Sequence, residues 1–254
     1  MLVSLIILFA FYLGLFFLSV KLKDNSIVDI FWGFGFLVIA NTTFFLEAEK
    51  TTDQIMITIL ISLWWIRLFM HILSKWLNSS WEDFRYQEFR RNWEWFYTRS
   101  FFQVYMLQFI IMLIIAIPIF LVNIYWNYSE NILYLYVVGA FVAFFGLVYE
   151  SIADYQMKKF KENKNPWEIL TSWLFRYSRF PQYFGESVFW LGISLMGIGI
   201  NILSIISYIL ILGLLLFVSW IPYIEEKYKN NPWYQKYKKQ TNKFIPGPPR
   251  NLEE

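Results

Sequence analysis

The sequence contains no cysteine and only one histidine, and these two scarcities restrict its chemistry. Without cysteine the chain cannot form a disulfide, supply a thiol nucleophile or bind an iron–sulfur cluster. His71 has no acidic pair at ligand spacing beside it, so we expect no metal site. The sequence also lacks a Walker-type phosphate loop and a Gly-x-Gly-x-x-Gly motif after a strand, so a bound nucleotide would require another mode of binding.

Charge is also scarce, since only 16% of the 254 residues are charged, whereas 57% are hydrophobic and 22% are aromatic. This composition predicts an all-α, polytopic integral membrane protein that forms one membrane domain over residues 1–254. The long apolar blocks predict seven transmembrane helices, at residues 2–20, 27–46, 55–73, 101–125, 132–153, 184–200 and 202–223.

The basic residues predict how these helices are oriented. Of the 22 lysines and arginines, all except Lys50 fall at one end of the predicted helices, in the loops there and in the C-terminal tail. The positive-inside rule therefore predicts an N-terminus outside and a C-terminus in the cytosol. Residues 155–180 become a cytosolic loop and residues 224–254 a basic cytosolic tail. We expect the bacterial inner membrane, or the endoplasmic reticulum in a eukaryote.

This confinement of the basic residues to membrane-adjacent loops also bears on partners. It favours membrane lipid headgroups or a cytosolic anion over nucleic acid. The sequence does not specify an oligomeric state.

Residues 176–190 combine two arginines, a helix start and an acid near the predicted cytosolic surface. Pro181 suits the first turn of a helix. Arg176 and Arg179 lie just before that turn, where free N–H groups favour anions, so the junction suits a phosphate-bearing ligand. An interfacial arginine belt with one buried acid is an equally supported alternative. The helix would carry one distinct stripe, formed by Gln182, Gly185, Glu186, Phe189 and Trp190.

Three ionisable residues fall inside the predicted second and third spans. Asp29 begins one polar face, and Arg67 and His71 share a face of the next helix, so they could line one pocket. Ionisable side chains at membrane depth are costly unless they are paired, which makes these residues functional candidates. The structural alternatives are that Asp29 pairs with Arg67 to join the two helices and that His71 is a packing residue.

Several segments, in order along nearly the whole chain, resemble one known family. Ser178-Arg-Phe-Pro-Gln-Tyr-Phe-Gly-Glu186 resembles the Arg-His-Pro-Asn-Tyr-x-Gly-Glu motif of the steroid 5-alpha-reductase family, in particular its bacterial DUF1295 branch. Residues 27–36 resemble that branch's Val-Asp-x-x-Trp-Gly segment, and Arg67-Leu68 with residues 82–86 resembles its Arg-Leu and Glu-Asp-x-Arg-Tyr pair. Residues 153–161 are similar to its Ala-Asp-x-Gln-x-x-x-Phe-Lys segment.

The resemblance implies a seven-helix fold that holds NADPH near the cytosolic face. It implies hydride transfer to a carbon–carbon double bond conjugated to a carbonyl, in a steroid-like or isoprenoid substrate that enters from the bilayer. Asp29, with Arg67, or His71 across from it, would polarise the carbonyl. The implied cofactor residues, with their basic and C-terminal neighbours, are Asp154, Lys161, Arg176, Arg179, Gln182, Tyr183, Glu186, Trp190, Glu226 and Tyr237.

The motif departs from the family pattern at two positions and leaves two other functions open. Phe180 stands where the family has histidine, and Gln182 stands where it has asparagine. A similar motif occurs in isoprenylcysteine carboxyl methyltransferases, so an S-adenosylmethionine-dependent lipid or isoprenyl methyltransferase is the first alternative. A non-catalytic lipid-binding membrane protein is the second. The segments around Asp29 and Arg67 fit the reductase branch better.

Overall fold

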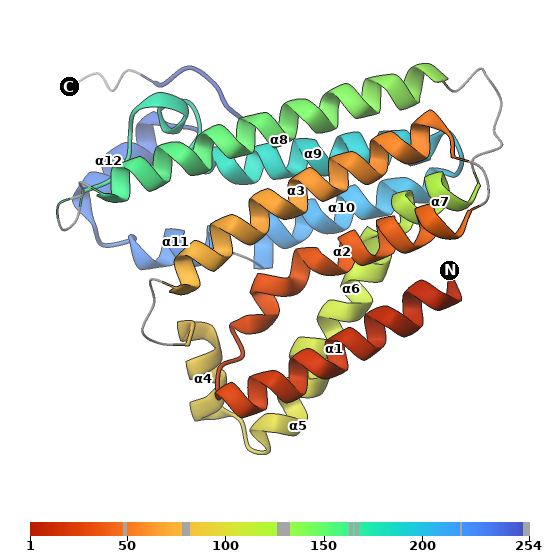
Figure 1. The fold of residues 1–254 in the computed structure, drawn as a ribbon. Helices are drawn as coiled ribbons and strands as arrows, with labels where there is room; N and C mark the ends of the chain where they lie inside the picture. Colours follow the sequence, from red (N-terminus) through yellow and green to blue (C-terminus); the bar gives the residue numbers. More distant parts are fainter. Residues whose placement is uncertain are drawn as a thin grey trace. The chain divides into compact units, whose positions relative to one another are not determined.

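The computed structural model describes residues 1–47, 50–77, 82–125, 133–162, 165, 168–218 and 220–250 (Figure 1). Within these ranges every regular element is a helix, which confirms the predicted all-α class. The chain divides into two compact units, which are Met1–Tyr136 with Met196–Ser204, and Val137–Leu195 with Ile205–Glu254. Residue 132 of the fifth predicted span and residues 251–254 of the predicted tail lie outside the described ranges.

Six helical segments in the described ranges are long and apolar enough to cross a membrane, which is consistent with an integral membrane protein. The sequence predicted seven. The additional helix, α9 (Pro181–Ile198), has 18 residues but is not apolar enough to be counted as a candidate span. Its hydropathy is lowered by Gln182, Glu186 and several serines and glycines. The six segments are Leu2–Leu22, Ile27–Leu46, Thr52–Leu77, Phe96–Ile115, Tyr134–Glu162 and Ile202–Lys227.

The first unit is built around α2 (Ile27–Leu46), which packs against α1 (Leu2–Leu22), α3 (Thr52–Leu77) and α7 (Ile117–Ile124). Phe36 of α2 and Trp64 of α3 are fully buried, with ring centroids 5.7 Å apart. Helix α1 ends at Leu22 because Lys23 adopts a left-handed conformation, with φ of 56°, and its N–H caps the last turn.

The predicted span 101–125 is not one continuous helix. A π-helix, η1 (Phe101–Met106), leads into α6 (Leu107–Ile115), and α7 begins after a break at Ala116. Pro118 explains the break, because it lacks an N–H and its ring clashes with the carbonyl one turn earlier. A buried amide then fixes α7. Asn123 Nδ2 donates to Thr43 Oγ1 at 2.8 Å, and Gln54 Nε2 donates to the Asn123 carbonyl at 2.8 Å.

The second unit contains a very close helix pair, α8 (Leu133–Glu162) and α9. A Cβ added at Gly146 of α8 would lie 2.3 Å from the Phe189 backbone nitrogen, and one added at Gly185 of α9 would lie 2.7 Å from that of Glu150. Only glycine permits this approach of two backbones. Two positions of the stripe predicted on residues 182–190, Gly185 and Phe189, therefore pack against α8.

The remaining elements of this unit lead to the C-terminal tail. They are the 3₁₀ turn η3 (Trp173–Arg176), α10 (Ile205–Gly213), the π-helix η5 (Leu214–Val218), α11 (Trp220–Lys227) and α12 (Pro232–Gln240). Helix α8 continues to Glu162, so residues 155–162 of the predicted loop are helical. Helix α12 starts at Pro232 because the Asn231 side chain accepts from the N–H groups of Trp233 and Tyr234.

Candidate functional site

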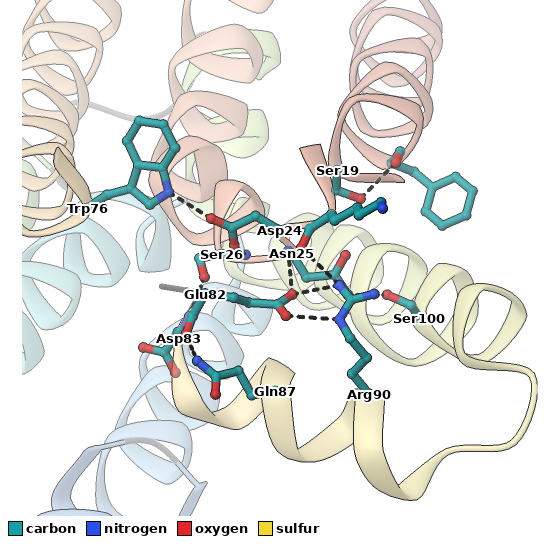
Figure 2. A network of polar contacts seen from close by, with 12 residues as sticks. Ser19, Asp24, Asn25, Ser26, Trp76, Glu82, Asp83, Gln87, Arg90 and Ser100 are labelled. Atoms are coloured by element: carbon teal, nitrogen blue, oxygen red, sulfur yellow. Dashed lines mark hydrogen bonds and ion pairs between the residues drawn. The ribbon is translucent and has the colours of Figure 1, made fainter. Parts of the chain in front are cut away.

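A polar clamp in the first unit joins the turn between α1 and α2 to residues 82–100 (Figure 2). Glu82 is the centre of this clamp. Its Oε1 accepts from the Asn25 N–H at 2.8 Å, and its two oxygens accept from Nε and Nη2 of Arg90, both at 3.0 Å. The Asn25 amide donates to Ser100 Oγ at 2.6 Å. These bonds tie the turn between α1 and α2 to Glu82, Arg90 and Ser100.

Asp83 extends the clamp and starts α4 (Phe84–Asn92). Its N–H donates to Ser26 Oγ at 2.7 Å, and its Oδ1 accepts from the N–H of Arg85 at 3.2 Å and from Arg85 Nε at 2.9 Å. This N-cap presents Arg85 and Tyr86, in the first turn of α4, toward α2.

Asp29 on α2 receives both of these side chains. Arg85 Nη2 donates to Asp29 Oδ2 at 2.6 Å, and the Tyr86 hydroxyl donates to Asp29 Oδ1 at 2.8 Å. These partners differ from Arg67, which the sequence offered as the structural partner of Asp29. Both belong to residues 82–86, the segment that resembles the family's Glu-Asp-x-Arg-Tyr pattern.

Arg67 and His71 lie one turn apart on α3, as their spacing predicted. Arg67 is half-buried and His71 is exposed. The residues that donate hydrogen bonds to Asp29 come instead from the start of α4.

The surroundings of Asp29 keep both partners in their protonated forms. Burial raises the pKa of Tyr86 well above its ordinary value, and the adjacent Asp29 carboxylate raises it further. Burial alone would lower the pKa of Arg85, but Asp29 and Asp83 outweigh it and the net direction is upward. Tyr86 is therefore a hydrogen-bond donor throughout the physiological pH range.

A second cluster, in the second unit, surrounds Arg179, which lies two residues before the start of α9. Its side chain is only 5% exposed. Arg179 Nη1 forms an ion pair with Glu225 Oε1 on α11, and the Tyr234 hydroxyl of α12 donates to the same oxygen at 2.7 Å. Lys238 Nζ contacts the other oxygen, Glu225 Oε2, at 2.6 Å. We call Arg179, Glu225, Tyr234 and Lys238 the arginine cluster.

The tail after α12 fixes the backbone at this cluster. The Arg179 N–H donates to the Asn242 carbonyl at 2.9 Å, and Ser178 Oγ donates to the Phe244 carbonyl at 2.7 Å. The Gly247 N–H donates to the Tyr177 carbonyl at 3.0 Å. The buried Tyr237 hydroxyl donates to the Phe175 carbonyl. Residues 175–180 are thus held by the C-terminal tail as well as by α9.

Three buried polar atoms near the α9 N-terminus have no hydrogen-bond partner among the residues that the structure describes. They are Arg179 Nε, Gln182 Oε1 and the Tyr149 hydroxyl, whose ring lies 5.5 Å from that of Phe184. Buried polar groups are normally satisfied, so unpaired ones indicate a missing partner. Arg179 Nε suits an oxyanion, and Gln182 Oε1 suits an N–H donor.

The other predicted cofactor residues differ in their exposure. Asp154, Tyr183 and Glu186 are half-buried, and Trp190 is fully buried. Lys161 and Arg176 are exposed.

The two adjacent glutamates of the tail have different partners. Glu226, the predicted one, is exposed and pairs with Lys229, whereas Glu225 pairs with Arg179. Neighbouring helical positions point in different directions, so sequence spacing alone could not identify Glu225 as the partner of Arg179.

Comparison with known proteins identifies one family. A model of the family described as "Protein of unknown function (DUF1295)" matches residues 15–241. No curated protein and no solved structure matches the chain. Asp29 with its partners and the whole arginine cluster fall inside the matched residues.

Proposed function

The chain belongs to the DUF1295 family, and we propose that it is a membrane-embedded, NADPH-dependent reductase. Its substrate would be a hydrophobic steroid-like or isoprenoid molecule with a carbon–carbon double bond conjugated to a carbonyl. This proposal extends the resemblance to the steroid 5-alpha-reductase family. When bound, NADPH would supply the hydride for such a reduction.

The observation that supports the proposal most strongly is the pair of unsatisfied atoms beside the α9 N-terminus. Arg179 Nε is a buried cationic donor and Gln182 Oε1 is a buried acceptor. A phosphorylated nucleotide that carries N–H groups offers a partner to each. In this proposal Arg179 and Gln182 hold the cofactor directly, while Tyr183, Glu186 and Asp154 contribute to its wall and exposed Arg176 and Lys161 attract its negative charge.

The first unit supplies a hydrogen-bond donor that suits conjugate reduction. Hydride addition to an enone leaves negative charge on the carbonyl oxygen, and a preorganised donor at that oxygen lowers the barrier. The Tyr86 hydroxyl can donate one hydrogen bond, which it donates to Asp29 Oδ1 in this structure. A substrate carbonyl oxygen would compete with Asp29 Oδ1 for this hydrogen bond, while Arg85 keeps the carboxylate in place. Tyr86 thereby replaces His71 and Arg67 beside Asp29 in the proposed catalytic set.

The proposed topology has seven spans, with α9 as the span additional to the six. The N-terminus lies outside and the C-terminus lies in the cytosol, as the basic residues predict. Fusions of a cytosol-active reporter after Asp53 and at the C-terminus test this arrangement. We expect activity only at the C-terminus, and activity at Asp53 would overturn the topology.

The function is tested by binding and by turnover. Detergent-solubilised protein is titrated calorimetrically with NADPH and with S-adenosylmethionine, and NADPH oxidation is followed with a hydrophobic enone. We expect NADPH to bind and to be oxidised. Binding of S-adenosylmethionine alone would identify a methyltransferase. Binding of neither compound at near-millimolar concentration would leave a lipid-binding protein.

A further inference from the structure

We propose that Glu225 is a positioning residue that orients Arg179, so that the Nε edge of the guanidinium receives a phosphate oxyanion. Lys238 and Tyr234 hold Glu225 in place for this task. The inference deepens the proposed function and rests on it only for the statement that the phosphate belongs to NADPH. The site itself is recognised by its chemistry, which is that of a phosphate ester or diphosphate.

Both carboxylate oxygens of Glu225 have partners. Oε1 accepts from Arg179 Nη1 and from the Tyr234 hydroxyl, and Oε2 contacts Lys238 Nζ at 2.6 Å. The Glu225 side chain is 16% exposed. Because its partners are Arg179 and two residues of α12, the Glu225 side chain has little freedom to rotate. The ion pair with Glu225 in turn restricts the Arg179 side chain.

The Arg179 guanidinium has donors that Glu225 does not use. A guanidinium carries five N–H donors in a rigid plane and binds carboxylates and phosphates through one edge at a time. Glu225 engages Nη1, while Nε is buried and has no hydrogen-bond partner in the described part of the chain. The Arg179 N–H also donates to the Asn242 carbonyl, so the residue is restrained through its backbone as well. The free edge is therefore preorganised rather than mobile.

The arginine cluster and the α9 N-terminus together carry positive charge. Arg179 and Lys238 are cationic and Glu225 is anionic, so the cluster keeps one positive charge after its internal pairing. The 18-residue helix α9, which starts at Pro181, adds the partial positive charge of its N-terminus. A doubly negative phosphate would be attracted to this combination, whereas a neutral acceptor would form a weaker hydrogen bond with Arg179 Nε and gain nothing from the net charge.

The main competing interpretation makes the opposite prediction. Glu225 could instead occupy the anion site and compete with a ligand for Arg179. Removing its charge would then strengthen phosphate binding. If Glu225 is a positioning residue, removing its charge loosens Arg179 and weakens binding. The sign of the change in affinity therefore separates the two roles.

The experiment measures the binding of inorganic pyrophosphate and of NADPH to wild-type protein and to Glu225→Gln, each by calorimetry in detergent. We expect the Kd of both ligands to rise about tenfold in the variant, as for the loss of one charge-assisted contact. In the reductase assay we expect a higher KM for NADPH with kcat nearly unchanged. Glu94→Gln is the control for the loss of one carboxylate charge, because Glu94 is exposed and lies outside the arginine cluster, and it should bind like wild type.

Tyr234→Phe guards against a folding defect in Glu225→Gln. It removes the hydrogen bond to Glu225 and the weak 3.4 Å hydrogen bond that Tyr234 accepts from Arg179 Nη1, but it leaves the ion pair between Glu225 and Arg179. We expect a smaller rise in Kd, about twofold to threefold. Unchanged or tighter pyrophosphate binding in both variants would overturn the positioning role. Failure of the wild type to bind pyrophosphate would refute the oxyanion site. Pyrophosphate binding that depends on Glu225 without any NADPH binding would retain the site and refute the reductase proposal.

Discussion

The polar clamp of the first unit and the arginine cluster of the second use similar residues to different ends. In the clamp, Glu82 accepts hydrogen bonds from both Arg90 and the Asn25 N–H. In the arginine cluster, Glu225 is equally surrounded, but Arg179 Nε stays buried without a hydrogen-bond partner among the described residues. A satisfied network stabilises a fold, whereas a buried donor left over from such a network is available to bind a ligand.

Asp29 belongs to both kinds of network. It is joined to the clamp through Arg85, yet its second partner, Tyr86, has a hydroxyl that could donate its hydrogen bond to a substrate instead. The first unit would then contain both a structural clamp and a hydrogen-bond donor for a substrate.

The strongest test of the contrast is turnover in Tyr86→Phe and Asp29→Asn. If Tyr86 donates to the substrate oxygen, Tyr86→Phe should lower kcat by about 10²–10³-fold, the usual cost of losing one such donor. Asp29→Asn should lower kcat as well, because Arg85 and Tyr86 lose the carboxylate that orients them. The NADPH Kd, measured by calorimetry, should stay close to that of wild type in both variants.

His71→Ala provides the control for this test, since His71 is exposed and is not a partner of Asp29. It should keep nearly full turnover. Full turnover in well-folded Tyr86→Phe would remove the hydroxyl from the mechanism. The polar clamp, Asp29, Arg85 and Tyr86 would then have a structural role only.

The clamp itself is tested through stability. Glu82→Ala leaves Arg90 and the Asn25 N–H without their shared acceptor. Losing hydrogen bonds to a charged group of this kind costs about 2–3 kcal/mol. The Tm in detergent should therefore fall by roughly 5–10 °C. Glu88→Ala, at an exposed position of α4, should change the Tm little. Equal melting of the two variants would show that the clamp does not stabilise the fold.

The sequence predicted elements better than partners. Long apolar blocks and Pro181 correctly placed α1, α2 and the start of α9, because hydropathy and helix-start rules are local. The break at Ala116 was missed, although Pro118 carried a local signal for it.

Side-chain partners depend on contacts between distant segments, which periodicity cannot specify. Arg85 lies 56 residues from Asp29, and Glu225 lies 46 residues from Arg179. Helical spacing could show that Arg67 and His71 share a face but not that an N-cap at Asp83 would bring Arg85 and Tyr86 to Asp29. Sequence reasoning therefore selected Asp29 and Arg179 as candidates and missed the residues that hold them.

The open edge of the arginine cluster is tested by Arg179→Lys. A lysine is a single point charge and cannot keep the pair with Glu225 while also offering a planar edge to an oxyanion. NADPH affinity should fall about tenfold or more, nearly as far as in Arg179→Ala. Arg176→Lys is the control, since Arg176 is exposed and lysine retains its long-range attraction. Retention of wild-type affinity in Arg179→Lys would show that the guanidinium edge is not used.

The smallest effect is the response of the two clusters to alkaline pH. Burial raises the pKa of Tyr86 and of Tyr234, and the neighbouring carboxylates raise both further. Below the ordinary tyrosine pKa of about 10, the hydroxyls are protonated in the folded and unfolded states alike, and their contribution to stability is complete. Above it only the unfolded chain ionises, so the free energy of unfolding falls by about 1.4 kcal/mol per pH unit for each tyrosine until its folded pKa is reached.

The Tm should therefore decline by roughly 2–4 °C per tyrosine between about pH 10 and 11. Tyr86→Phe and Tyr234→Phe should each make the decline shallower, because phenylalanine has no proton to lose. Tyr155→Phe is the matched control, since Tyr155 is exposed, and it should keep the wild-type slope. If bound NADPH makes the decline shallower in wild type but not in Tyr234→Phe, the hydroxyl that holds Glu225 is coupled to the ligand. If the ligand has the same effect in both proteins, the arginine cluster is not coupled to the ligand and is, like the clamp, a structural network.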